Sequence, residues 1–161
     1  MSGFCLPMVR PENGWRLNKT LHGRSVHRPE DVPHHNVVKG YNDPGTGDAV
    51  DFFSDAGTLV QCCHDGKVVA ARSIPGAGFV VYVSGGAHGH LVTTVYCHLS
   101  GKGRVAFGKV LHMGDKIGYV SRELSDPHLH FEVWVDGIAF SGTRPDVLSG
   151  RVLYLAQGWK G

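Results

Sequence analysis

Two histidines separated by one residue, His128 and His130, are the residues of this sequence best suited to chemistry. Side chains at positions i and i+2 of a β-strand point to one face, so both imidazoles would project together while Leu129 enters the core. Two imidazoles on one face suit a metal ion, or a metal ligand beside an acid–base group. Surface or hydrogen-bonded histidines can share this spacing, so the pair alone leaves both interpretations open.

Asp51 and His98 are two further candidates. Asp51 interrupts a short apolar run over residues 50–53, and a carboxylate buried there needs a partner, which an arginine or a backbone amide can also supply. His98 ends an alternating segment in which we expect Val95, Cys97 and Leu99 to face the core. Thr94, Tyr96 and His98 would then lie on the polar or cleft side.

The elements that must position these residues are strands. With 23 glycines and 8 prolines, the chain favours short strands and turns, and no segment predicts a long helix. We therefore predict an all-β fold, an antiparallel sheet or sandwich with a groove. The eight expected strands cover residues 50–53, 59–63, 67–71, 78–84, 91–98, 105–110, 116–120 and 128–135.

Turn signals separate these strands. Asp65-Gly66 predicts a hairpin, and Gly85-Gly86 is expected to open a loop that carries His88 and His90. His64 and His112 fall at turn positions, so we expect both on the surface.

The length of 161 residues indicates one domain with flanking segments. We predict a basic N-terminal arm or long ordered loop over residues 1–44, with one short strand near residues 36–38. The main domain covers residues 45–140, and a tail over residues 141–161 adds one strand at residues 151–156.

Composition excludes several classes of protein. The net charge of +2 is too small to indicate a nucleic-acid-binding protein, and no run of 18 apolar residues predicts a transmembrane helix. The first ten residues lack the apolar core of a signal peptide, so we expect none. The four cysteines have no CxxC spacing and are expected to be small buried thiols, with a disulfide or a thiol-bound metal as the alternative.

Five sequence blocks follow one another along the chain and together are more specific than any one of them. They are Asp51-Phe52-Phe53 with Gly57-Thr58, Asp65-Gly66-Lys67-Val68, Thr94-x-Tyr96-x-His98-Leu99-Ser100, Gly114-Asp115-x-Ile117-Gly118 and Pro127-His128-Leu129-His130-Phe131-Glu132. This order resembles the LytM/lysostaphin-like zinc metallopeptidases, which cut peptide cross-links in bacterial peptidoglycan. The resemblance covers about residues 45–140 and implies the all-β fold of that family, of the duplicated hybrid motif type.

The resemblance also implies roles for individual residues. Asp51 and His130 would be zinc ligands, and His98 and His128 would flank the water and the substrate carbonyl. Bound zinc lowers the pKa of a water to roughly 7 and polarises a carbonyl, and nearby imidazoles move protons or stabilise the oxyanion. Glu132 shares the face of His130 and is a candidate to support it.

One ligand position departs from the family pattern. The family has a histidine four residues before the aspartate, where this chain has Gly47. His35 is our first candidate for a replacement ligand, followed by His34 or Asp48, although Asp48 would face away from Asp51 in a regular strand. The loop over residues 121–127 is also shorter and more charged than in the family, so substrate preference cannot be carried over.

Two functions therefore remain open from the sequence. One is a zinc endopeptidase that acts on the peptide of the bacterial wall. The other is a domain of the same fold that lacks a zinc ligand and serves as a wall-binding or scaffold protein. Without an export signal, we expect a phage route to the wall, as a virion component or through release at lysis, with other virion or cell-wall proteins as partners.

Overall fold

The computed structural model describes residues 5–8, 24–27, 49–87, 90–135 and 138–139, and these ranges contain no helix. This confirms the all-β class. The strands are β1 (Arg24–His27), β2 (Ala49–Phe53), β3 (Leu59–Gln61), β4 (Gly66–Ile74), β5 (Gly78–Ala87), β6 (His90–Leu99), β7 (Val110–Leu111), β8 (Lys116–Tyr119), β9 (His128–Val135) and β10 (Ile138–Ala139).

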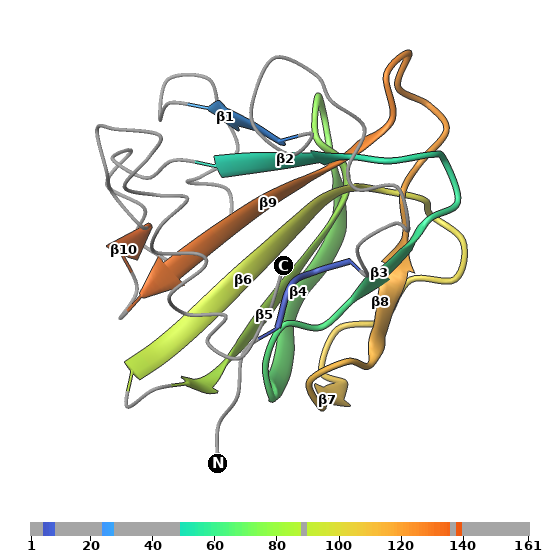
Figure 1. The fold of residues 1–161 in the computed structure, drawn as a ribbon. Helices are drawn as coiled ribbons and strands as arrows, with labels where there is room; N and C mark the ends of the chain where they lie inside the picture. Colours follow the sequence, from blue (N-terminus) through green and yellow to red (C-terminus); the bar gives the residue numbers. More distant parts are fainter. Residues whose placement is uncertain (1–4, 9–23, 28–48, 88–89, 136–137, 140–161) are drawn as a thin grey trace.

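Eight of the strands form one antiparallel sheet in the order β1-β2-β9-β6-β5-β4-β7, with β10 paired to β9. β3 and β8 form a separate antiparallel pair. Figure 1 shows the long strands β9, β6 and β5 side by side and the small sheet to their right. The order places β2 against β9 and β9 against β6, so the three strands that carry the candidate residues are neighbours.

Apolar side chains pack on both faces of the large sheet, which therefore lacks one fully solvated face. One cluster joins the large sheet to the small one. Its members include Phe52, Val60, Tyr96, Ile117, Leu129 and Phe131. The second cluster lies on the opposite face and includes Tyr82, Val95, Cys97 and Trp134. Buried residues on both faces explain why alternation alone could not identify the cleft side of β6.

β6 contains a bulge at its C-terminal end. Tyr96 pairs with Val81 and Leu99 pairs with Phe79, so β6 has one more residue than β5 between these two pairs. His98 adopts a φ of 62°, in the left-handed region that few non-glycine residues occupy. The prediction that Leu99 shares a face with Cys97 is wrong, because the bulge returns Leu99 to the cluster of Tyr96.

Gly85-Gly86 continues β5 instead of opening a loop. Gly85 pairs with Val92 and Gly86 with Leu91, so the expected long loop is wrong. A Cβ at Gly85 would collide with the carbonyl oxygen of Asp65, because the start of β4 passes very close at this point. Of the two histidines expected in the loop, His90 begins β6 and His88 lies outside the described residues.

The hairpin expected at Asp65-Gly66 is also wrong. β3, which precedes this turn, pairs with β8. β4, which follows it, pairs with β5 and β7. The turn therefore connects the small sheet to the large one, which a local turn signal cannot reveal.

His64 is fully buried, which contradicts its expected surface position. Its Nδ1–H donates to the carbonyl oxygen of Asp65 at 2.9 Å, and its Nε2 lies 3.1 Å from the hydroxyl of Thr94. The Thr94 hydroxyl is 2.9 Å from that of Tyr96, which accepts the backbone N–H of Cys63 at 2.9 Å. These bonds hold the imidazole in place, and burial lowers the pKa of His64. His112 is exposed, as expected.

The pKa shift of His64 predicts a loss of stability in acid. Because the pKa is lower in the folded protein, the unfolded chain binds more protons below its usual value of about 6.5, so the free energy of unfolding falls as pH drops below that value. The slope approaches about 1.4 kcal/mol per pH unit for one proton. We expect urea unfolding of a His64→Gln variant to depend less on pH between 7.5 and 5 than wild type at equal zinc concentration. Equal slopes for the two proteins would contradict the assignment.

The four cysteines are free, and Cys62, Cys63 and Cys97 are buried, which confirms the expected buried thiols. The strand expected over residues 59–63 ends at Gln61, and both Cys62 and Cys63 join the larger core cluster. Burial raises the pKa of Cys63 well above its usual value, so this thiol stays protonated.

Parts of the expected N-terminal arm pack against the domain. The backbone N–H of Cys5 donates to the carbonyl oxygen of Cys63 at 2.8 Å, and Leu6 and Met8 are buried in the larger cluster. β1 pairs with β2 along its whole length. The strands expected near residues 36–38 and 151–156 lie outside the described residues. Within the described ranges, no helix is long and apolar enough to cross a membrane.

Candidate metal and catalytic site

The site forms where β2, β9 and the end of β6 meet. Asp51 pairs directly with His130 across β2 and β9, and Cys97 pairs with His130 across β6 and β9. Residues directly opposite one another in an antiparallel pair share a face. The register therefore brings Asp51, His128 and His130 to one face, as the i and i+2 spacing predicts for the two histidines.

Asp51 and His130 form the buried centre of the site. Nδ1 of His130 lies 3.3 Å from Oδ1 of Asp51, and the side chains are 5% and 3% exposed. Nε2 of His130 lies 2.9 Å from Oε1 of Glu132. An ionised Glu132 carboxylate can only accept a hydrogen bond, so Nε2 carries the proton in the neutral ring of His130. The lone pair of Nδ1 then faces Asp51.

Glu132 orients His130, as expected from their shared face. The carboxylate is buried, and its Oε2 accepts the indole N–H of Trp134 at 3.0 Å. Glu132 is therefore held on one side by Trp134 and on the other by His130, and is not a solvated residue at the strand end. Trp134 was not identified from the sequence, although it continues the same i and i+2 spacing along β9.

The charges around His130 favour its protonated form in the absence of another cation. Burial alone would lower its pKa, but hydrogen bonds with Asp51 and Glu132 and the charges of both carboxylates raise it to about 9. A positive charge is thus strongly favoured between these two carboxylates, either as a proton or as a metal ion that replaces it.

His128 is oriented by the loop before β9. Its Nδ1–H donates to the carbonyl oxygen of Asp126 at 2.8 Å, which leaves the Nε2 lone pair directed into the site. Nε2 lies 3.5 Å from Oδ2 of Asp51, and the side chain is 17% exposed. The Phe53 ring packs beside it with the ring centroids 5.0 Å apart. His128 is thus fixed, yet partly exposed to solvent.

His98 completes the cluster. Its ring centroid lies 4.8 Å from that of His128 and 5.9 Å from that of His130, with both pairs edge to face. The bulge and the left-handed backbone of His98 place the imidazole in this position. In a regular strand, His98 would point to the face opposite to that of Cys97 and His130. A residue held in this sparsely populated conformation is typical of functional sites.

The donor set fits zinc. Oδ1 of Asp51 and Nδ1 of His130 converge from two strands, and a carboxylate oxygen and an imidazole nitrogen are common zinc ligands. The other nitrogen of His130 is held by a carboxylate, the usual support for a zinc-binding histidine. Asp51 and His130 would therefore hold the ion, with His98 and His128 beside it.

A second group of possible donors is a weaker candidate. Atoms of Cys97, His130 and Glu132 lie within 4.8 Å of one another. However, burial raises the pKa of Cys97 well above its usual value, with further increases from the charges of Glu132 and Asp51. Metals bind the thiolate, and Nε2 of His130 already bonds to Glu132, so this group is less suited to zinc than the Asp51 side.

The candidate replacement ligands lie outside the part of the chain that the structure describes. These are His35, His34 and Asp48, together with Gly47 itself. The third protein ligand therefore stays a prediction.

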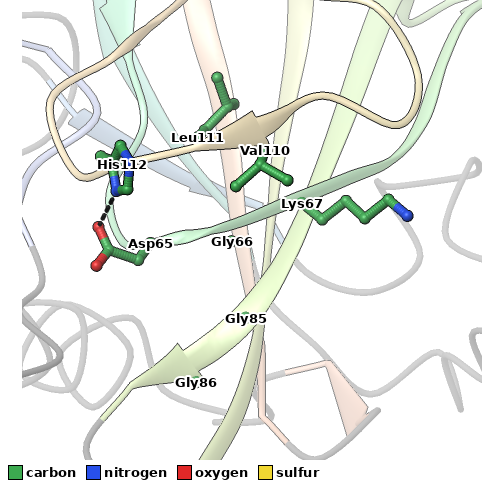
Figure 2. A pocket seen from close by; sticks show the side chains of 8 residues that line it. All are labelled: Asp65, Gly66, Lys67, Gly85, Gly86, Val110, Leu111 and His112. Carbon is green, nitrogen blue, oxygen red and sulfur yellow. Dashed lines mark ion pairs between the residues drawn. The ribbon is translucent and has the colours of Figure 1, made fainter.

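A pocket at the start of β4 is separate from this site. It has a volume of about 490 Å³ and is lined by the start of β4, the end of β5 and β7. Figure 2 shows Asp65 and His112 facing each other at its rim, with Nδ1 and Oδ1 3.7 Å apart. Oδ1 of Asp65 also accepts the backbone N–H of Met113 at 2.8 Å, so this carboxylate holds a turn in place.

A comparison with known proteins finds a sequence relative of this chain. The chain is 34% identical over 118 residues to the peptidoglycan DD-endopeptidase ShyB of Vibrio cholerae serotype O1, a match that covers 66% of this chain and 27% of that protein. This chain therefore spans only about a quarter of that relative.

Two solved structures are similar in fold. The catalytic domain of the antimicrobial peptidase lysostaphin from Staphylococcus simulans is 29% identical, with a TM-score of 0.50 over 58% of this chain and 73% of that chain. A zinc-containing peptidase from Vibrio cholerae is 26% identical, with a TM-score of 0.56 over 89% of this chain and 40% of that chain. The model of peptidase family M23 matches residues 45–141, more than half of the sequence. The chain belongs to peptidase family M23, the group of LytM/lysostaphin-like peptidases.

Proposed function

We propose that this protein is a zinc-dependent endopeptidase that hydrolyses peptide cross-links of bacterial peptidoglycan. The observation that carries the proposal is the Asp51–His130 pair, buried and supported by Glu132, with two further imidazoles beside it. The family relationship and the named activity of the Vibrio cholerae relative support the same substrate class.

His128 is suited to move protons during the reaction. Its Nε2 lone pair faces the site while Nδ1 is fixed by the Asp126 carbonyl oxygen. It would accept a proton from the attacking water and pass it to the leaving amine. The ring is mostly buried and lies against Phe53, which limits its motion.

His98 is suited to stabilise charge on the substrate. Its ring is 4.8 Å from that of His128, so both can reach one carbonyl group. An imidazole N–H directed at the developing oxyanion lowers the energy of the transition state. When bound, zinc would activate the water and polarise the scissile carbonyl. Burial of Asp51 and His130 keeps competing water away from their donor atoms.

The alternative is a wall-binding or scaffold domain without catalytic activity, and Gly47 at the third ligand position favours it. The two functions differ in zinc content and turnover. We expect the purified protein to bind close to one zinc ion and to release amines from purified peptidoglycan.

A metal-free protein that gains no activity in added zinc would support the alternative, particularly if a Gly47→His variant acquires both zinc and turnover. If wild type is active and His35→Ala abolishes zinc binding, His35 is the replacement ligand and the alternative fails. The expected phage route stays a prediction.

A further inference from the structure

A pocket beside His98 has the size and composition of a subsite for one amino-acid side chain. Its volume is about 290 Å³, and His98 forms part of its lining. A water molecule occupies about 30 Å³ in the liquid, so the pocket has room for several waters or for one long side chain. Because the His98 ring contacts that of His128, the pocket opens next to the proposed reaction centre.

The two walls of this pocket are both bonded to the backbone of His98. On one side, the N–H of His98 donates to the carbonyl oxygen of Ala77 at 2.9 Å. On the other side, the carbonyl oxygen of His98 accepts the N–H of Ser121 at 2.9 Å. The Ser121 hydroxyl in turn accepts the N–H of Glu123 at 3.1 Å. The position of Glu123 relative to His98 is therefore set by two consecutive hydrogen bonds.

The chemistry of the lining is apolar with one charge. Ile74 and Leu124 supply aliphatic surface, and Gly76 leaves open space where a side chain would otherwise project. Glu123 supplies the carboxylate of the lining and is exposed to solvent. Among the described residues, no lysine, arginine or histidine lies within ion-pair distance of this carboxylate.

We infer that this pocket is a specificity subsite in which Glu123 selects a substrate residue with an amine on an aliphatic side chain, as in a diamino acid, next to the scissile bond. Aliphatic carbons would pack against Ile74 and Leu124, and the ammonium group would reach Glu123 at the rim. The inference rests on the proposed function, since it places substrate peptide in the groove beside His98.

The test compares two synthetic wall-type peptides that differ only in charge, one with lysine beside the scissile bond and one with acetylated lysine. Binding is measured by calorimetry and turnover by amine release, for wild type and Glu123→Gln. We expect wild type to prefer the lysine peptide by about three- to tenfold, mainly in KM and Kd, since exposed ion pairs contribute modestly. Glu123→Gln should reduce the preference to about one. Glu123→Asp should restore part of it, and added salt should weaken it.

Asp55→Asn is the matched control, because it removes an exposed carboxylate that does not line the pocket. We expect this variant to keep the wild-type preference. Turnover without charge preference, or an equal loss of preference in Asp55→Asn, overturns the inference and leaves the proposed function intact. Charge-selective binding without turnover supports the subsite and counts against the proposed function. If neither peptide binds, the inference fails.

Discussion

Replacement of Asp51 with asparagine is expected to lower zinc affinity by more than about a hundredfold and to abolish peptide hydrolysis at neutral pH. Asparagine keeps the shape of the side chain but removes the charge that faces Nδ1 of His130 at 3.3 Å. An amide oxygen is a much weaker zinc ligand than a carboxylate, and the positive ion would lose one of its two buried ligands.

The measurement is zinc titration by competition with a chelating dye, together with amine release from purified peptidoglycan. Asp55→Asn is again a suitable control, because it changes net charge equally at an exposed position. Circular dichroism must show that the Asp51→Asn variant is folded. Zinc affinity that stays within a few-fold of wild type would remove Asp51 from the ligand set.

The second large effect is expected at His128. A His128→Gln variant should bind zinc within a few-fold of wild type, whereas kcat should fall by about 10²- to 10⁴-fold, the usual contribution of a general acid–base group. The glutamine amide is polar and of similar length, but it cannot accept and release a proton as Nε2 of His128 can.

This variant separates a proton-transfer role from a ligand role. A loss of kcat with intact zinc binding supports the role in proton transfer. If zinc binding is lost as well, His128 belongs to the ligand set, which its distance of 3.5 Å from Asp51 would permit after a small movement. Unchanged kcat would exclude both roles.

The part of the site that follows from local geometry could be predicted from the sequence. His128 and His130 share a face because a strand has a period of two, and Glu132 follows by the same rule. That Asp51 lies directly opposite His130 depends on the register of β2 and β9, which the family resemblance implied but the residues alone did not specify. The all-β class followed from the many glycines and turn signals.

The features that were missed depend on contacts between distant segments. His64 is at a turn, yet it is buried because β6 supplies Thr94 as a partner for its ring. β3 pairs with β8, which no local signal near residue 60 could show. His98 reaches the site because of the bulge in β6 and not by regular alternation. Alternation would place Cys97 and Leu99 on the same face, but they belong to the two different core clusters.

The bulge in β6 restricts the changes in length that this strand can accept. Between the pairs Tyr96–Val81 and Leu99–Phe79, β6 has one residue more than β5, and His98 lies in this extra span. Deletion of a single residue here would restore a regular ladder but turn His98 away from β9. Insertions and deletions in this lineage should therefore be confined to the loops, and an alignment that places a gap at positions 97–98 would mark a relative without this arrangement of histidines.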